Sequence, residues 1–282
     1  MNQRTSGHGM RSVRADLAYQ RHLLVNVIFS GPPGAGDRGW TLVDAGLFGS
    51  AGRIIRGAEE RFGRNARPAA IILTHGHFDH VGALRELIAY WNAPVFAHPF
   101  EFPFLTGARP YPPPEPRVGG GAMAALSFAY PRGPYDFGRW LHPLPEEGLV
   151  PGMPRWRWVH TPGHTPGHVA LVRPSDRTMI AGDAFVTTRQ ESAIAVLLQR
   201  REMHGPPAYF TPDWVSARRS VQMLADLEPD AAITGHGRAF SGEMLREELH
   251  ELARDFGRRA VPRHGRYVRG LEAQWPALEA RG

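Results

Sequence analysis

Cysteine and lysine are both absent from this chain of 282 residues, so all 33 residues counted as Lys or Arg are arginine. Without cysteine the chain has no disulfide, no thiolate metal ligand and no cysteine nucleophile, and any bound metal must be held by nitrogen and oxygen atoms. Without lysine, Schiff-base catalysis is excluded. No apolar run reaches the roughly 18 residues that a membrane-spanning helix needs. A soluble protein without a membrane partner is therefore expected.

The excess of positive charge is spread along the chain. The formal net charge is +6 at pH 7, yet the arginines are scattered and gather only in short pairs. Nucleic-acid-binding surfaces usually concentrate their basic residues, so a nucleic-acid partner is not expected. The N-terminal segment carries arginines but no apolar core before Leu23, which is unlike a signal peptide and predicts a cytoplasmic location. Hydrophobic residues make up 42% of the chain, enough for one domain over residues 1–282.

Strand and helix patterns alternate through both halves of the chain. Apolar and β-branched runs predict strands at residues 23–29, 41–43, 68–74, 94–97, 156–159, 169–172, 179–181 and 231–234. Apolar residues at helical spacing predict helices at residues 50–62, 81–90, 211–227 and 241–257, the first capped by Ser50 and the third by Thr211. We expect residues 241–282 to be a helical extension at the C-terminus. Candidate functional residues follow several of the strands.

Residues 99–135 form a predicted insertion between the two halves. The part from 99 to 117 is too rich in proline for a helix and too irregular for a strand, and residues 122–129 look helical. Loops of this length in compact domains are commonly functional. We interpret the insertion as a cover that brings aromatic side chains to a substrate: Phe100, Phe102, Phe104 and Tyr111. The alternatives are an insertion anchored by its own aromatics and a contact between two copies of the chain in a homodimer.

The segment "HGHFDH" is the densest group of candidate ligands. It places His75, His77, Asp79 and His80 within six residues, directly after an apolar strand. Neutral imidazole and carboxylate are common metal ligands, and together they give a charge-balanced set of nitrogen and oxygen atoms. A single histidine would more often be structural, but four such residues in one turn favour a metal site. A turn of this kind can present its side chains to two neighbouring ions.

Several motifs give the chain a resemblance to a known family. "HGHFDH" matches the H-x-H-x-D-H pattern of the metallo-β-lactamase-fold hydrolase superfamily. Three further matches follow in that superfamily's order: "TPGHTPGH" around His164, "AGDAF" around Asp183 and "TGHG" around His236. The resemblance extends from the "LVDAG" strand at Leu42 to Gly237. One of these motifs alone would be weak, whereas four in order are specific.

The resemblance implies an α/β fold, a four-layer αββα sandwich with the site at one edge of two sheets. It also implies two divalent metal ions. Zinc is the expected metal, and the same ligands would also accept iron or manganese. One ion would be held by His75, His77 and His164, the other by Asp79, His80 and His236, with Asp183 bridging both. Asp44 would orient a ligand histidine or cap a turn. His168 lies close to the ligand position without matching it and is expected to support the site.

Hydrolysis of a small molecule is the chemistry that the resemblance implies. Two adjacent cations make water nucleophilic near neutral pH and polarise a carbonyl or phosphoryl oxygen, and Asp79 would orient the water and pass on a proton. An ester, thioester or lactone with an apolar acyl or aryl part is the expected substrate, packed against the aromatics of the insertion and Phe185.

Departures from subfamily patterns leave other functions open. The segment after Asp183 lacks the Gly-Cys-Gly-Arg type sequence of glyoxalase II and persulfide dioxygenases, and Val186 stands where quorum-quenching lactonases have tyrosine. A phosphodiesterase or nuclease of the same fold and a mononuclear-iron persulfide dioxygenase are the alternatives. A non-catalytic metal-binding scaffold is a further one, disfavoured because all seven ligand positions are filled.

Overall fold

The computed structural model describes residues 9–198, 201–269 and 271. The first of its two sheets is built from the N-terminal half of the chain. Seven strands lie in this sheet in the order of the sequence: β1 (Met10–Arg14), β2 (Leu17–His22), β3 (Val25–Ser30), β4 (Thr41–Val43), β5 (Ala70–Ile72), β6 (Val95–Ala97) and β7 (Leu141–Pro143). Strands β1 to β4 pair antiparallel, whereas β4 to β7 pair parallel. The carboxyl ends of β4, β5 and β6 therefore meet at one edge.

The second sheet is built from the C-terminal half, with its strands in the reverse of sequence order. Its order is β13 (Phe240–Ser241), β12 (Ala231–Thr234), β11 (Thr178–Gly182), β10 (Val169–Arg173), β9 (Met153–His160) and β8 (Leu149–Val150). The pair β11 and β12 is parallel, and the other pairs are antiparallel. Since β9, β11 and β12 run in one direction, the loops that follow them open at the same edge.

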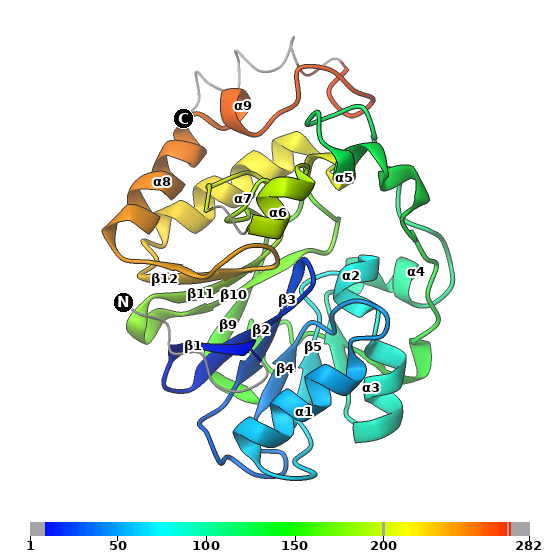
Figure 1. Cartoon of the computed structure of the whole chain (residues 1–282), viewed down its shortest axis with the longest axis vertical. Coiled ribbons are helices and arrows are strands. Elements are labelled where there is room, and N and C mark those ends of the chain that lie inside the picture. The colour runs from blue at the N-terminus through cyan, green and yellow to red at the C-terminus, as the bar shows by residue number, and fades with distance from the viewer. Residues whose placement is uncertain (1–8, 199–200, 270, 272–282) are drawn as a thin grey trace.

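Helices cover the outer face of each sheet and complete four layers, α, β, β and α. Figure 1 shows α1 (Ala51–Phe62) and α3 (Leu84–Trp91) beside the first sheet, and α7 (Trp214–Asp226) and α8 (Glu243–Arg254) beside the second. The remaining α-helices are short: α2 (Phe78–Val81), α4 (Phe102–Leu105), α5 (Ala122–Ala125), α6 (Ala193–Leu198) and α9 (Phe256–Arg259). The expected αββα sandwich is confirmed. No helix in the described residues combines the length and apolarity needed to cross a membrane.

Three apolar clusters hold these layers together. One lies between the first sheet and its helices, where the rings of Trp40 and Phe62 stack with centroids 4.5 Å apart. A second lies between the second sheet and α7 and α8, and it contains Leu245, Leu249 and Leu252. The third fills the space between the sheets with side chains such as Ile72 and Ile180. Burial of apolar surface on both faces of both sheets is the main driving force for this arrangement.

The local patterns predicted most elements, and the differences have physical reasons. The helix expected at 81–90 is divided into α2 and α3 because Gly82 donates its N–H to Gly46 O, 2.8 Å away, outside the helix. The helix expected from Thr211 begins at Trp214, because Asp213 is the N-cap and accepts a hydrogen bond from Ser216 N. Ser50 does cap α1 by position, although its side chain makes no capping hydrogen bond.

The expected absence of helix in residues 99–117 was wrong for its first turns. Pro99–Glu101 form a 3-10 helix that continues into α4, and the His98 side chain accepts a hydrogen bond from Phe100 N. Proline is tolerated at the start of a helix because the N–H that it lacks has no partner there. Residues 122–129 form α5 and a 3-10 turn, as the pattern indicated. At the C-terminus α8 and α9 are helical, but the expected helical extension was wrong for residues 260–269, which form turns and bends. Residues 270 and 272–282 lie outside the described residues.

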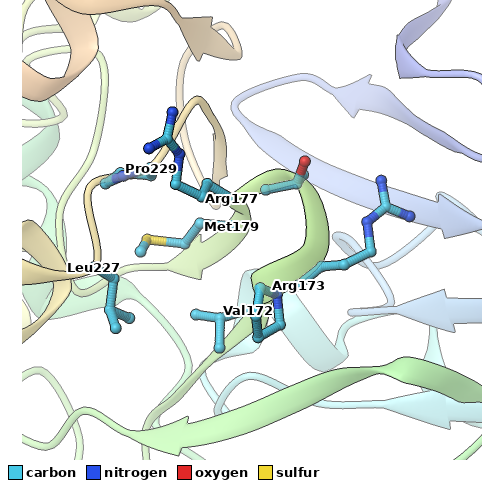
Figure 2. A pocket seen from close by; sticks show the side chains of 8 residues that line it. Val172, Arg173, Arg177, Met179, Leu227 and Pro229 are labelled. Atoms are coloured by element: carbon cyan, nitrogen blue, oxygen red, sulfur yellow. The ribbon is translucent and has the colours of Figure 1, made fainter.

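A small pocket lies at the far end of β10 and β11, away from the edge where the β9, β11 and β12 loops open. Figure 2 shows Val172, Met179, Leu227 and Pro229 around it, with Arg173 and Arg177 at its margin. Its volume is about 160 Å³. The two arginines are paired with aspartates, Arg173 with Asp16 and Asp176 and Arg177 with Asp230. The charges at this margin are therefore already neutralised within the chain.

Candidate metal centre

The candidate ligands lie where the loops from both sheets meet at one edge. The "HGHFDH" segment follows β5, the loop with His164 joins β9 to β10, Asp183 follows β11, and His236 follows β12. Backbone hydrogen bonds connect these loops, since Val169 N donates to Thr74 O (2.9 Å) and Gly235 N donates to Gly182 O (2.7 Å). The antiparallel and parallel pairings of both sheets thus bring residues far apart in sequence to one place.

All seven side chains that the resemblance suggested come together, and all are buried. Their nitrogen and oxygen atoms form groups in which the potential ligand atoms lie within 4.8 Å of one another: His75, His77 and His164; Asp79, His80 and His236; and His75, His80 and Asp183. The first two groups have the same members as the two expected ligand sets. The third shows that Asp183 reaches histidines of both sets.

Asp183 lies between the two sets. Its Oδ2 is 3.5 Å from His164 Nε2 and 3.1 Å from His236 Nε2, and its Oδ1 is 3.6 Å from His80 Nε2. Glycine at position 235 permits this placement, because a Cβ there would lie 2.0 Å from Asp183 Oδ1. The carboxylate can therefore contact two neighbouring cations at once.

The hydrogen bonds on the outer side of the histidines fix which ring nitrogen faces the cluster. His236 Nδ1 lies 2.8 Å from Leu24 O, which can only accept, so Nδ1 carries a proton and Nε2 is the nitrogen that faces inward, 3.1 Å from Asp183 Oδ2. His164 Nδ1 lies 3.1 Å from Thr211 Oγ1, whose own hydrogen goes to Pro207 O. The Nε2 lone pair of His164 therefore also faces inward. Thr211 was expected to cap a helix, and this role was not visible in the sequence.

The same logic applies around Asp44. His80 Nδ1 is 2.9 Å from Asp44 Oδ2, and Thr74 donates its hydroxyl to Asp44, which leaves Thr74 Oγ1 to accept from His75 Nδ1 at 3.1 Å. Both rings then direct Nε2 toward the cluster. Asp44 also accepts from Thr74 N (2.8 Å), 30 residues further along the chain, so it links the ends of β4 and β5 while it orients a candidate ligand, the first of the two roles that the sequence left open.

These atoms fit a metal ion on two independent grounds. His75 Nε2, His80 Nε2 and Asp183 Oδ1 are buried and lack a hydrogen-bond partner among the described residues. A buried polar atom without a partner is costly, and a cation would satisfy all three. In addition, His77 Nδ1 lies 2.9 Å from His164 Nε2, close enough for both nitrogens to bind one ion after a small adjustment.

The electrostatics of the cluster also favour bound cations. Burial lowers the pKa of His75 and His164 well below the usual imidazole value, and lowers that of His77 to about 3. These rings are therefore neutral at pH 7, as a metal ligand must be. Burial would also lower the pKa of His80, but Asp44, Asp183 and Asp79 raise it well above the usual value. The carboxylates that hold a proton on His80 would equally stabilise a metal ion.

His168 supports the cluster from behind. Its Nε2 accepts a hydrogen bond from Asp183 N (2.8 Å), and its Nδ1 lies 2.7 Å from Thr161 Oγ1. Burial lowers the pKa of His168 to about 3, so the ring is neutral and can accept that bond. Glycine at position 182 makes room, since a Cβ there would lie 2.5 Å from His168 Nε2. The ring thus fixes the backbone at Asp183.

Glu101, which the sequence did not single out, connects both ligand-bearing loops. It is fully buried, and Oε2 accepts from Gly76 N (2.9 Å), between His75 and His77. Its other oxygen accepts from Gly167 N at 2.8 Å in the loop that carries His164. Tyr111 also donates its hydroxyl to this carboxylate. The insertion therefore fixes the distance between the two halves of the cluster.

The substitution Glu101→Gln is expected to lower metal affinity by about 10- to 100-fold, as removal of groups that orient ligands usually does. The amide offers one acceptor oxygen in place of two, so one of the two loops loses its contact. Metal affinity would be measured by competition with a chromophoric chelator. Glu115→Gln is the matched control, because Glu115 is equally buried and also accepts a backbone N–H, from Arg266, but none from either ligand loop. An equal loss of metal affinity in Glu101→Gln and Glu115→Gln would contradict the proposed role of Glu101 in holding the two ligand loops.

The aromatic side chains near the cluster are only in part those that the sequence indicated. Tyr111 packs on His77 with ring centroids 4.6 Å apart, and Phe210, which the sequence did not identify, packs on the same ring at 4.8 Å. Phe104 stacks behind Tyr111 at 4.0 Å. Around Phe210 the rings of Phe78 and Tyr130 continue this aromatic wall.

Three expected substrate contacts are not in place. Phe100 is 58% exposed and its ring contacts His98 and His160 instead of the cluster. Phe185 is fully buried in the core beneath α7 and α8, so no ligand reaches it. Phe102 is half-buried against the core of the first sheet. The helix at residues 99–105 explains the error for Phe100 and Phe102, because helical spacing turns neighbouring aromatics to different sides, whereas an extended loop was assumed.

Comparison with known proteins agrees with this geometry. The chain matches the family model described as "Metallo-beta-lactamase superfamily" over residues 24–236. It is 46% identical over 230 residues to "Probable metallo-hydrolase YflN" of Bacillus subtilis (strain 168), covering 82% of this chain and 87% of that protein. It is 26% identical over 152 residues to "Hydroxyacylglutathione hydrolase GloC" of Haemophilus influenzae, covering 53% and 62% of the two chains.

Solved structures show the same fold. The structure of "TTHA1623 in a di-iron-bound form" has a TM-score of 0.53 and 25% identity, covering 84% of this chain and 96% of that one. Fold, cluster and relatives together define a metal-dependent hydrolase. The chain belongs to the metallo-β-lactamase superfamily.

Proposed function

We propose that this protein holds two divalent metal ions and hydrolyses a carboxylic ester, thioester or lactone. The observation that carries the proposal is the pair of three-residue groups joined by one carboxylate. His75, His77 and His164 would hold one ion, Asp79, His80 and His236 the other, and Asp183 would contact both. Five imidazoles and two carboxylates suit zinc, and they also accept iron or manganese. The similarity to a protein in a di-iron-bound form supports the proposed number of two metal ions, and it also supports iron as the alternative to zinc.

The chain's own residues would direct the reaction. Bound divalent ions would supply a nucleophile from water at neutral pH and polarise the carbonyl oxygen. Asp79 Oδ2 lies 3.4 Å from His236 Nε2, and at 7% exposure Asp79 is the least buried of the seven side chains, so it could accept a proton from water and return one to the leaving oxygen or sulfur. Burial raises the pKa of Asp79 in the metal-free protein, whereas a bound cation beside it would favour the ionised carboxylate, the form that accepts a proton from water. The aromatic wall would hold the acyl or aryl part and exclude bulk water.

A carbonyl substrate is favoured over a phosphodiester. Similarity to hydroxyacylglutathione hydrolases, which the names of two relatives describe, supports thioester or ester chemistry. The side chains that surround His77 are aromatic rather than basic, and a nucleic-acid backbone would need arginines there.

The decisive experiment combines metal analysis with a substrate panel. Elemental analysis of the metal-loaded protein is expected to give about two equivalents per chain, as a two-ion site requires. Aryl esters, thioesters and lactones are expected to be hydrolysed, and bis-aryl phosphodiesters are not. A firm value of one equivalent would instead support the mononuclear-iron dioxygenase alternative. Turnover of phosphodiesters alone would support the nuclease alternative and remove the carbonyl proposal.

The aromatic wall predicts a chain-length effect. The variant Phe210→Ala is expected to lower kcat/KM for a long-chain acyl ester more than for an acetyl ester, because each methylene that loses burial costs about 0.8 kcal/mol. Phe100→Ala is the matched control, since it removes the same ring from an exposed position that does not contact the cluster. It should leave both esters unchanged. An equal loss for both esters in Phe210→Ala would show that the ring supports His77 without binding substrate.

A further inference from the structure

A second cleft lies between the insertion and the C-terminal segment, and none of the seven cluster residues lines it. Its volume is about 530 Å³. Four stretches form its walls, at residues 117–120, 189–191, 204–208 and 259–264. Four arginines line it, namely Arg117, Arg189, Arg259 and Arg263, together with His204 and His264. The single carboxylate among the lining residues is Glu191.

Two of these arginines are not neutralised by the chain. Arg117 pairs with Glu115 (3.0 Å) and Arg259 pairs with Glu251 (2.9 Å). Arg189 donates only to a backbone oxygen, Gly119 O at 2.9 Å, and Arg263 has no ion pair or hydrogen bond within the part of the chain that the structure describes. Two of the arginines that line the cleft therefore have unused donors.

The backbone of the cleft adds further donors. Gly119 and Gly120 both have positive φ (72° and 63°), and neither N–H has a hydrogen-bond partner within residues 9–198, 201–269 and 271. A Cβ on Gly120 would meet no atom within 4 Å, so this part of the wall is open. Glycine N–H groups beside arginines form a common binding arrangement for anions with several oxygens, because charged and backbone donors converge on them.

We propose that this cleft binds a small molecule through a phosphate group. Arg189 and Arg263 would donate to the phosphate oxygens, and the N–H groups of Gly119 and Gly120 would complete the site. The bound anion would neutralise arginines from the loop after β11 and from the C-terminal segment at once and so hold the two together. One 3-10 helix, Ala208–Phe210, connects the cleft with the metal centre, since Ala208 lines the cleft and Phe210 contacts His77. This site does not depend on the proposed hydrolysis.

The proposal is tested by calorimetric titration of the metal-loaded protein with phenyl phosphate. Arg189→Ala/Arg263→Ala is expected to bind it at least about tenfold more weakly, because charge-assisted hydrogen bonds to phosphate are lost. These two positions are chosen because neither arginine forms an ion pair whose loss would destabilise the fold. Arg219→Ala on α7 is the matched control, an exposed arginine that does not line the cleft, and it should bind as the wild type does. Circular dichroism would verify that all three proteins are folded.

A kinetic comparison shows whether the phosphate belongs to the substrate of the metal centre or to a separate ligand. An aryl ester with a phosphate at its far end and a neutral ester of the same length would be compared in the wild type and the double variant. A rise in KM for the phosphorylated ester alone would mean that the phosphate belongs to the substrate. Unchanged KM values with weaker phenyl phosphate binding would mean a separate ligand. Phenyl phosphate affinity that is the same in the double variant, or absent in the wild type, would overturn the proposal whatever the esterase activity.

Discussion

Replacement of Asp79 by asparagine is expected to lower kcat by about 10²- to 10⁴-fold, the usual contribution of a positioned acid or base. The amide keeps the size of the side chain, but it can neither accept the proton of the attacking water nor return one to the leaving group. Its position supports this expectation, because Asp79 Oδ2 lies near His236 Nε2 (3.4 Å) and His80 Nε2 (4.0 Å), and Asp79 is the least buried of the seven side chains. Steady-state kinetics on an aryl ester would measure the effect.

Stability provides the control for this variant. Burial raises the pKa of Asp79, so at pH 7 the charged form is disfavoured in the folded, metal-free protein relative to the unfolded chain. Removal of that charge should therefore leave the Tm of the metal-free protein unchanged or raise it. A variant that retains wild-type turnover would show that Asp79 does not transfer protons. A variant that loses turnover together with Tm would show only that it is misfolded.

Replacement of Asp183 by asparagine is expected to have the larger effect on metal content. The carboxylate lies within 3.6 Å of nitrogens from both ligand sets, so its loss removes an oxygen from each proposed ion. Bound metal should fall from two equivalents to one or none, and kcat should fall by about 10³-fold, the effect of losing one strong electrostatic group in an active site. Elemental analysis and kinetics on the same preparation would test both parts.

The two aspartate variants should differ in the stability of the metal-free protein. Burial opposes ionisation of Asp183, but His236 and His80 lower its pKa well below the usual value. A carboxyl whose folded pKa is depressed stabilises the fold above its unfolded pKa of about 3.9, and this stability is lost as the pH falls through the folded pKa. At pH 7 the contribution is complete, so Asp183→Asn should lower the Tm, in contrast to Asp79→Asn. A Tm that falls in Asp79→Asn and rises in Asp183→Asn would contradict the proposed electrostatics.

The sequence by itself determined the elements and the candidate ligands. Apolar runs and helical spacing predicted most strands and the helices α1, α3, α7 and α8, because these patterns depend only on residues that are close together in the sequence. The four motifs in order identified His75, His77, Asp79, His80, His164, Asp183 and His236 as one set. Their positions after strands indicated a common edge, and the structure brings all of them together.

Only the tertiary structure decided how the set is held and what lies around it. Glu101 is 25 residues from Gly76 and 66 residues from Gly167, and no local pattern relates a glutamate to two glycine N–H groups at such separations. Thr211 has the sequence of a helix cap, yet its hydroxyl accepts from His164, 47 residues away. Phe210 and Phe100 are the same residue type, but packing places Phe210 against His77 and leaves Phe100 largely exposed to solvent. Side-chain direction is set by contacts between distant segments, and such contacts exist only after the two sheets have packed together.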